Sequence, residues 1–285
     1  MLSFERAGRR RARSGPLLGA LSALSLALGL ALSGGAAAQD AASANLCGAE
    51  PPPPIPANLK LDIESLRRAG TAEQRGDYAQ AIRTLRPLAE AGNAQAQFNL
   101  AAYYDQGLGV GQDQALALHW YQLSAEQGYP PAENNLGAHY ADGVGAPRDP
   151  AQAAIWLKKG AEHGVAMAQF GLARIYLEGR GVAPDYAAAR LWASKAADQG
   201  LAEAQFTLFV LYAEGPPGVP RDDVKALMWA DLALTRYTAR EADRRRIAER
   251  DRGKLAADMT AKARADAVAL ERTWLGTHKP CSPTP

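Results

Sequence analysis

The chain has 285 residues, with 32 Lys and Arg against 30 Asp and Glu, and a formal net charge of +2. Residues 1–38 alone carry +4, from five Arg and one Glu, so the rest of the chain carries −2. This mildly acidic body argues against a DNA or RNA partner and against a polybasic grip on anionic lipid. Another protein is therefore the expected class of partner.

The first predicted element is a secretory signal over residues 1–38. A basic start precedes an uncharged apolar run at 17–32, and the small residues at 36–38 suit cleavage after Ala38. The run is shorter than the roughly 20 residues that span a bilayer comfortably. We therefore expect a periplasmic or secreted protein that meets the membrane only through its signal. An uncleaved membrane anchor is the alternative.

Residues 39–60 are predicted to be a disordered Pro-rich segment. The run Pro-Pro-Pro-Pro-Ile-Pro at 51–56 favours an extended polyproline II conformation and suits a spacer. The two cysteines of the chain, Cys47 and Cys281, lie near opposite ends of the mature protein, which an exported protein can oxidise. A disulfide that pins the Pro-rich segment along the array is one hypothesis. Two free thiols or an intermolecular link are the others.

From residue 77 onward the chain repeats with a period of 36 residues, apart from one extra residue near Pro216. The recurring residues are Gly92, Gly128, Gly164 and Gly200; Ala96, Ala132, Ala168 and Ala204; Leu100, Leu136, Leu172 and Leu208; Tyr104, Tyr140, Tyr176 and Tyr212; Trp120, Trp156, Trp192 and Trp229; and Asp77, Asp113, Asp149, Asp185 and Asp222. A fixed period of this length is typical of stacked repeat architectures.

Within each unit the spacing predicts two helices. Ala96, Leu100 and Tyr104 are four apart and share one helix face. Glycines then permit a tight turn with positive φ, and the Asp of the unit caps the second helix. One such hairpin cannot bury its apolar face alone, so stacked neighbours are expected.

The pattern A-x-x-x-L-[small]-x-x-Y-x-x-G-x-G, followed by D-x-x-x-A-x-x-W-x-x-x-A-x-x-G, resembles the Sel1-like repeat family, a relative of tetratricopeptide repeats. The resemblance implies an all-α fold, a right-handed α-solenoid of antiparallel helix pairs. We expect a tetratricopeptide-like hairpin over 61–92, Sel1-like repeats over 93–235, capping helices over 236–276 and a flexible tail over 277–285.

Departures from the pattern concern single positions and the C-terminal end. Thr84 replaces the Trp, and Phe209 replaces a small residue, which predicts a wider or displaced junction in the last unit. A long charged helix is expected over 238–257. The expected outward residues there are Arg244, Arg245 and Arg246. Thr260 is expected to cap a final helix with Val268, Leu270 and Trp274 inward.

The sequence offers no recognisable catalytic motif. It has no HExxH, Walker loop, GxSxG or Ser-x-x-Lys, and its four His residues are His119, His139, His163 and His278, to which no role is assigned. We therefore expect a non-catalytic scaffold or adaptor without cofactor or metal. Some Sel1-like proteins are linked to penicillin binding or hydrolysis, so a cell-wall-active hydrolase or glycan-binding module is the alternative. A structural self-assembler is a third interpretation.

The resemblance to tetratricopeptide arrays also implies a binding groove on the concave face, formed by the first helix of each pair. Residues two before and two after the recurring Leu would point into it. Those are Phe98, Ala102, Asn134, Ala138, Phe170, Arg174, Phe206 and Val210, of which Phe98, Asn134, Phe170, Arg174, Phe206 and Val210 are the predicted partner-binding residues. Core packing is an equal alternative for the three Phe residues.

A polar, mostly acidic row precedes the loop glycines. It consists of Gln106, Asp142, Glu178 and Glu214. A solvated helix end is the simpler interpretation, and a cationic partner is the alternative, because acidic groups there oppose the helix dipole.

Overall fold

The computed structural model describes residues 57–278, and over that range the chain is helical with no strand. The predicted signal, most of the Pro-rich segment, Cys47 and Cys281 lie outside these residues. The helices are α2 (Ala57–Gln74), α3 (Tyr78–Glu90), α4 (Ala94–Gln106), α5 (Gln114–Glu126), α6 (Pro130–Asp142), α7 (Pro150–Glu162), α8 (Ala166–Glu178), α9 (Tyr186–Asp198), α10 (Ala202–Glu214), α11 (Asp223–Arg236), α12 (Ala242–Asp258) and α13 (Ala261–Thr277), with one 3-10 turn, η2 (Ala239–Glu241). The first helix thus begins ahead of residue 61, where the first hairpin was expected to start.

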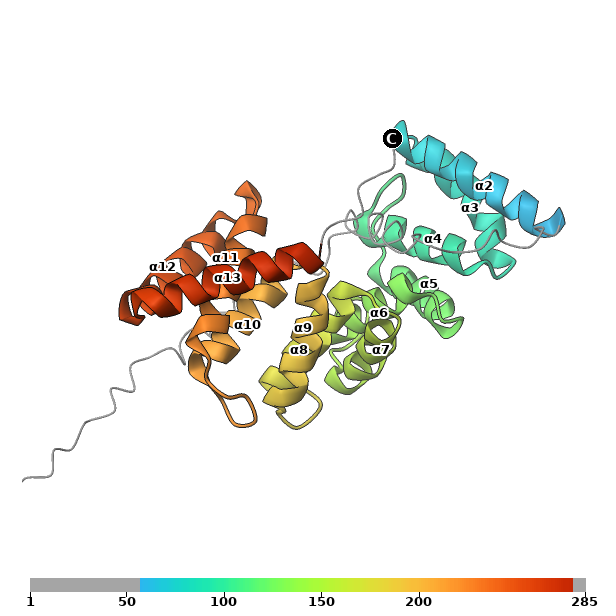
Figure 1. Ribbon diagram of the computed structural model, residues 1–285. Coiled ribbons are helices and arrows are strands. Elements are labelled where there is room, and N and C mark those ends of the chain that lie inside the picture. The colour runs from blue at the N-terminus through green and yellow to red at the C-terminus, as the bar shows by residue number, and fades with distance from the viewer. Residues whose placement is uncertain (1–56, 279–285) are drawn as a thin grey trace, which may run out of the picture.

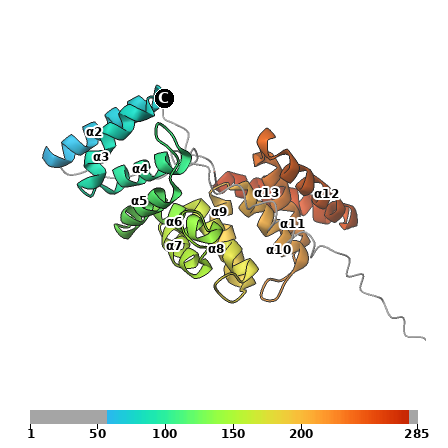
Figure 2. The ribbon, with the colours of Figure 1, turned by 180° about the vertical axis from the view of Figure 1, so that it is seen from behind.

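Helices pack against their neighbours in chain order, and the resulting pairs stack into a curved array (Figures 1 and 2). The first helices of two successive pairs, α6 and α8, also contact each other. Within the described range, no two second helices between α3 and α11 make comparable contact. Because neighbouring elements approach most closely on the inside of a bend, the first helices line the inner side of the array. The prediction of an all-α solenoid is confirmed.

The repeated Asp and Gly residues set the limits of the helices. The Asp side chains accept hydrogen bonds from backbone N–H groups of the first turn at Asp77, Asp113, Asp149, Asp185 and Asp222. This satisfies donors that a helix start otherwise leaves free. First helices end at glycines in the left-handed region: Gly107, Gly143, Gly179 and Gly215.

The second glycine of each loop packs on the preceding unit. A Cβ added at Gly109 would lie 2.7 Å from Tyr78 Cβ, and one at Gly181 would lie 2.5 Å from the carbonyl carbon of Pro150. Both neighbours stand at the start of the second helix of the unit before. Only glycine therefore fits between the loop and that helix.

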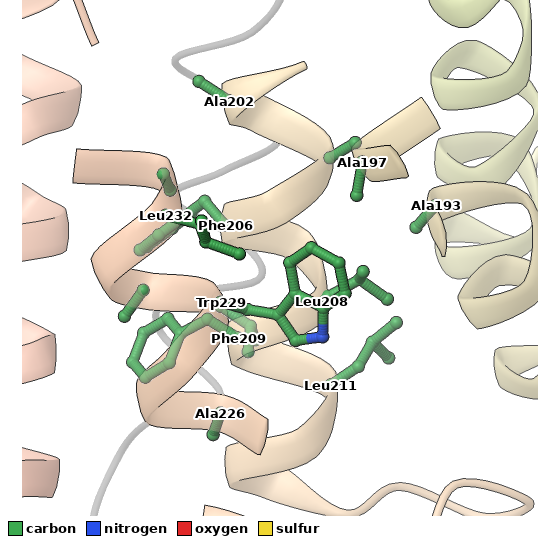
Figure 3. Packing of buried hydrophobic residues seen from close by; sticks show 14 of the residues in the cluster. Ala193, Ala197, Ala202, Phe206, Leu208, Phe209, Leu211, Ala226, Trp229 and Leu232 are labelled. Carbon is green, nitrogen blue, oxygen red and sulfur yellow. The ribbon is translucent and has the colours of Figure 1, made fainter. Parts of the chain in front are cut away.

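The core of the array is thin and built from small residues and leucines. The recurring Ala of the first helix is fully buried in every unit, as is the recurring Leu in nearly every unit. Figure 3 shows the last unit, where Phe206, Leu208 and Phe209 of α10 lie with Trp229 of α11 in one buried cluster. The small side chains let helices approach closely, and the larger ones fill the space between.

Phe209 does not widen the last junction, and that prediction is wrong. Its side chain is 1% exposed, and α10 packs on α11 as extensively as α4 packs on α5. The reason lies in the facing helix, where Ala230 occupies the position that Tyr121 and Leu157 hold in the first two matched units; in the third, Ala193 holds it and Ala173 holds the position of Phe209. A large residue on α10 therefore meets a small one on α11, which keeps the summed volume of the pair.

A ladder of glutamine hydrogen bonds joins successive units. In three units the Nε2 of a first-helix Gln donates to a carbonyl oxygen eight residues earlier, on the preceding second helix. The pairs are Gln97–Ala89 at 3.0 Å, Gln169–Ala161 at 3.2 Å and Gln205–Ala197 at 3.2 Å. The Oε1 of Gln97 and Gln169 in turn accepts from the Gln that ends the second helix, Gln127 at 2.7 Å and Gln199 at 2.8 Å.

One step of this ladder is different. Glu133 replaces the Gln, is 1% exposed, and its Oε2 lies 2.7 Å from Nδ1 of His163. A carboxylate cannot donate a hydrogen bond, so the link to the carbonyl of Ala125 is missing. The junction between α5 and α6 therefore lacks a hydrogen bond that the other junctions have.

The C-terminal helices both pack on α11. The long helix predicted over 238–257 is interrupted, because Thr238 and Glu241 form a capping box at η2 before α12 begins. Arg244 does not point outward as predicted. Its Nη1 donates to Oε1 of Glu203 at 2.7 Å, and its side chain is largely buried, because the carboxyl group of Glu203 needs a cationic partner there.

Helix α13 covers the outer face of the last unit. Thr260 accepts from the N–H of Ala263, as expected of its cap, and Trp274 packs edge-to-face on Trp229 at 5.7 Å. Val268 is 39% exposed, so its predicted inward position is wrong; Ala267 is the buried residue of that turn. None of the helices within residues 57–278 has the length and apolar character required to cross a bilayer.

Candidate functional site

Three of the predicted contact residues belong to the core. Phe170, Phe206 and Val210 are each 2–3% exposed and pack within the cluster that also holds α11. Their prediction as groove residues is corrected accordingly, because the close approach of neighbouring first helices on the inner side covers these positions. The packing alternative holds for Phe170 and Phe206.

Phe98 is only partly available, and Asn134 is buried, contrary to its prediction as a groove residue. The ring of Phe98 is half-buried, with centroids 5.7 Å from Tyr121 and 5.4 Å from Tyr129. Asn134 is buried, and its Nδ2 donates to Oδ1 of Asn135 at 3.0 Å. Its own Oδ1 has no hydrogen-bond partner.

Arg174 lies between the acidic residues of two successive first helices. Its Nη2 is 3.7 Å from Oε1 of Glu178, whose carboxyl also pairs with Arg180. Burial lowers the pKa of the Arg174 guanidinium, while Glu178 and Asp142 raise it and Arg180 lowers it. The side chain is 12% exposed, and its buried Nε has no partner. This guanidinium therefore occupies the space between α6 and α8 without satisfying all its donors.

A hollow of about 440 Å³ opens between α4 and α6, one unit before Arg174. Its lining is Asp105, Gln106, Gln112, Gln114, Ala138, His139, Asp142 and Val144. These come from the C-terminal parts of the two first helices, from the two loops that follow and from the first residue of α5. The hollow thus lies on the inner side of the array, across the junction between two units.

Two of the three glutamines that line the hollow donate to the backbone and leave their side-chain oxygens free. The Nε2 of Gln112 and of Gln114 both donate to the backbone carbonyl of Asp105, at 2.8 and 3.0 Å. One N–H donor of each amide is therefore engaged with the backbone. The Oε1 of Gln114 is buried and has no partner.

His139 is held against acceptors on both sides. Its Nδ1 lies 3.2 Å from the carbonyl oxygen of Val144, and its Nε2 lies 3.4 Å from Oδ2 of Asp105. The ring of Tyr121 packs edge-on at 5.2 Å, and burial raises the pKa of that phenol, with the charge of Asp105 adding to the effect. Asp142 stands at the rim, where desolvation on its protein side raises the pKa of its carboxyl although Arg174 and Arg148 lower it.

Sequence reasoning missed most of this site. Ala138 stood in the predicted groove row, and Gln106 and Asp142 stood in the polar, mostly acidic row, but no role was assigned to His139. The signal was a departure from the repeat at two positions. Asp105 on α4 corresponds to Ala141 on α6, and Ala138 on α6 corresponds to Arg174 on α8. Within the described part of the chain, no group of three or more His, Cys, Asp or Glu side chains could hold a metal ion.

Comparison with known families matches the Sel1 repeat at residues 94–129, 130–165, 166–201 and 202–236. No match is found among curated proteins. Among solved structures, the chain is similar to c5321, a protective antigen of uropathogenic Escherichia coli with an SLR fold. The identity is 34% and the TM-score 0.68, over 76% of this chain and 46% of the antigen.

A Sel1 repeat protein from Oxalobacter formigenes is also similar, with 34% identity and a TM-score of 0.55 over 71% of this chain and 60% of that one. This chain thus spans about half the length of the antigen and three fifths of the second protein. The four matched segments coincide with the four units α4–α5 to α10–α11.

Proposed function

The chain belongs to the Sel1 repeat family, whose members are generally protein-interaction modules, and from this premise we propose that it is a non-catalytic scaffold. It binds a segment of another protein along the inner side of the array. The predicted signal over residues 1–38 supports a location in the periplasm or outside the cell, with an envelope or periplasmic protein as the partner.

One observation carries this proposal. The first helices hold buried polar atoms without hydrogen-bond partners: Asn134 Oδ1, Arg174 Nε, Gln205 Oε1 and Glu214 Oε1. Two others, Gln114 Oε1 and Trp120 Nε1, lie on the second helix α5. Such atoms cost free energy unless another group satisfies them. Those of the first helices lie on α6, α8 and α10 in turn, as expected of a surface that contacts one extended segment.

In-cell photocrosslinking tests the proposal. A photoreactive residue at Gln106, exposed on the inner side, is expected to give one dominant protein adduct. The same residue at Leu191, which is 50% exposed on the outer face of α9, is the matched control and is expected to give none. The captured protein segment, once purified, is expected to bind the isolated chain and to lose about tenfold in affinity to an Arg174→Ala variant.

Diffuse adducts of similar strength at both positions would contradict a specific inner surface. Turnover of muropeptides or of a chromogenic β-lactam by the purified chain would favour an enzyme instead.

The location has its own test. Cell fractionation followed by N-terminal sequencing is expected to find the chain outside the cytoplasm and starting at Gln39. A full-length chain in the cytoplasm would exclude an envelope partner.

A further inference from the structure

The hollow between α4 and α6 has a filled counterpart one unit later. The 36-residue step places Ala138 at the position of Arg174, Gln106 at that of Asp142, and Asp142 at that of Glu178. Between α6 and α8 the guanidinium of Arg174 lies beside Glu178 and within electrostatic reach of Asp142. Between α4 and α6 the methyl group of Ala138 leaves the same place open. The space between α6 and α8 therefore shows that a guanidinium fits between two successive first helices of this array.

The lining of the hollow favours a ligand that donates hydrogen bonds. One N–H of each of the Gln112 and Gln114 amides goes to the backbone carbonyl of Asp105, and the ring nitrogens of His139 face Val144 and Asp105. The charged groups of the lining are the carboxylates of Asp105 and Asp142. Its buried atom without a hydrogen-bond partner is an acceptor, Oε1 of Gln114, although each glutamine amide keeps a second N–H. A cationic ligand that brings several hydrogen-bond donors fits these carboxylates and the free Oε1 of Gln114 best.

We propose that this hollow binds an arginine side chain of the protein segment that lies along the inner side of the array. A guanidinium carries five N–H donors, no acceptor and a permanent charge, which complements this lining. The inference rests on the proposed function and specifies the chemistry of its partner.

The charges around the hollow favour a cation. Asp105 is 16% exposed and faces only His139 among the ion pairs of the described residues, and Asp142 has no ion-pair partner within them. In the next interval Glu178 already pairs with Arg174 and Arg180. At this hollow neither carboxylate forms an ion pair with an arginine among the described residues, although Arg174 and Arg148 lie within electrostatic reach of Asp142. Charge-assisted hydrogen bonds to these carboxylates would be strong ones.

The test uses N-acetyl-arginine amide as the probe, with the mature chain followed by NMR. Titration is expected to shift the side-chain amides of Gln112 and Gln114 and the methyl group of Ala138 in a saturable manner. N-acetyl-citrulline amide has the same shape without the charge and is expected to leave them unshifted. Equal responses to both probes, or no saturable response to arginine, would overturn the inference.

Three variants sharpen the result. Asp105→Asn with Asp142→Asn is expected to weaken arginine binding by at least about tenfold. Ala138→Arg is expected to abolish it, because the added guanidinium fills the hollow as Arg174 fills the next one. Glu126→Gln with Glu162→Gln removes two exposed carboxylates at the ends of α5 and α7 and is the matched control, for which unchanged affinity is expected. Equal weakening in the control would reduce the effect to net charge and overturn the site.

Failure of this inference and failure of the proposed function give different results. A protein captured at Gln106 that binds equally well to wild type and to the Ala138→Arg variant overturns the arginine site alone. An arginine response without any captured protein overturns the proposed function, and with it a protein as the source of the arginine. Both hold if replacing an arginine of the captured segment by alanine weakens its binding to wild type about tenfold but not its binding to Ala138→Arg.

Discussion

The space between α4 and α6 and the space between α6 and α8 are bounded by equivalent helices of the same repeat, yet they are filled in different ways. The first contains a hollow rimmed by Asp105 and Asp142, whereas the second contains Arg174. The junctions next to them differ as well. Gln169 ties α8 to α7 by a hydrogen bond, whereas Glu133 on α6 has no such link to α5. A repeat array can thus keep its backbone constant and vary its inner surface through single positions.

The difference also supports the proposal that a partner binds at this part of the array. Repeat proteins gain stability from each unit and from each interface between neighbours. An interface that gives up a hydrogen bond and leaves a hollow is less stable than its neighbours, and an added ligand can recover that loss.

The largest effect is expected where the filled interval is emptied. Arg174→Ala removes a mostly buried side chain and leaves Asp142 and Glu178 without it, so we expect a loss of about 2 kcal/mol in the free energy of unfolding. Urea denaturation measures it. Arg148→Ala removes an exposed arginine of the neighbouring loop whose Nε donates to the carbonyl oxygen of Ala141, and this comparison variant should lose less, about 0.5–1 kcal/mol. Equal losses would mean that the two intervals do not differ in packing.

The next effect concerns the unusual step of the ladder. His163→Ala leaves the buried carboxyl group of Glu133 without its partner, and we expect a loss of about 1–2 kcal/mol. Gln199→Ala is the same change one unit later, where a neutral Gln169 remains, and should cost about 0.5–1 kcal/mol. Thermal unfolding of both variants decides the order. A larger loss at Gln199 would show that the Glu133–His163 pair contributes nothing special.

Converting that step to the common form is expected to stabilise the array. Glu133→Gln combined with His163→Gln supplies an N–H for the carbonyl of Ala125, as Gln97 does for Ala89. A typical intramolecular hydrogen bond is worth about 1 kcal/mol, so a gain of that size is expected in urea denaturation. The single His163→Gln variant is the control and should gain nothing. A double variant less stable than wild type would mean that the charged pair was the stronger link.

The smallest effect is a difference in protonation. Desolvation by burial raises the pKa of the Asp142 carboxyl above its ordinary value of 3.8, and the charge of Arg174 lowers it in part. The folded chain therefore holds a proton that the unfolded chain releases. This contribution to stability is complete below pH 3.8 and is lost as pH rises through the folded pKa. Arg174→Ala should raise the pKa further, as carboxyl-carbon NMR titration will show, and a lowered pKa would contradict the placement of Arg174.

The sequence predicted the repeated features well, because each follows from a local rule. Asp149 caps a helix and Gly143 ends one whatever lies elsewhere in the fold. The all-helical class and the stacking of units then follow, since an isolated hairpin leaves its apolar face exposed.

Predictions that depended on distant partners were less successful. Phe209 was expected to widen a junction, but Ala230, 21 residues later, supplies the room. Arg244 was expected to face solvent, but Glu203, 41 residues earlier, binds it. For Phe170 and Phe206 the sequence could not decide between the groove and the core, and both are buried. The curvature of the array determines how much of the inner side is covered, and the repeat pattern does not specify that curvature.

The loop glycines that rest on the unit before have a practical consequence for engineering. Each loop contacts the second helix of the preceding unit. A module cut within a loop would therefore lose part of that contact and would not fit well into another array. The turns between units are different, since a side chain added at Gly128 or Gly164 would meet nothing within 4 Å. Longer or shorter versions of this protein should therefore be spliced at those turns, in multiples of 36 residues, with every loop kept whole.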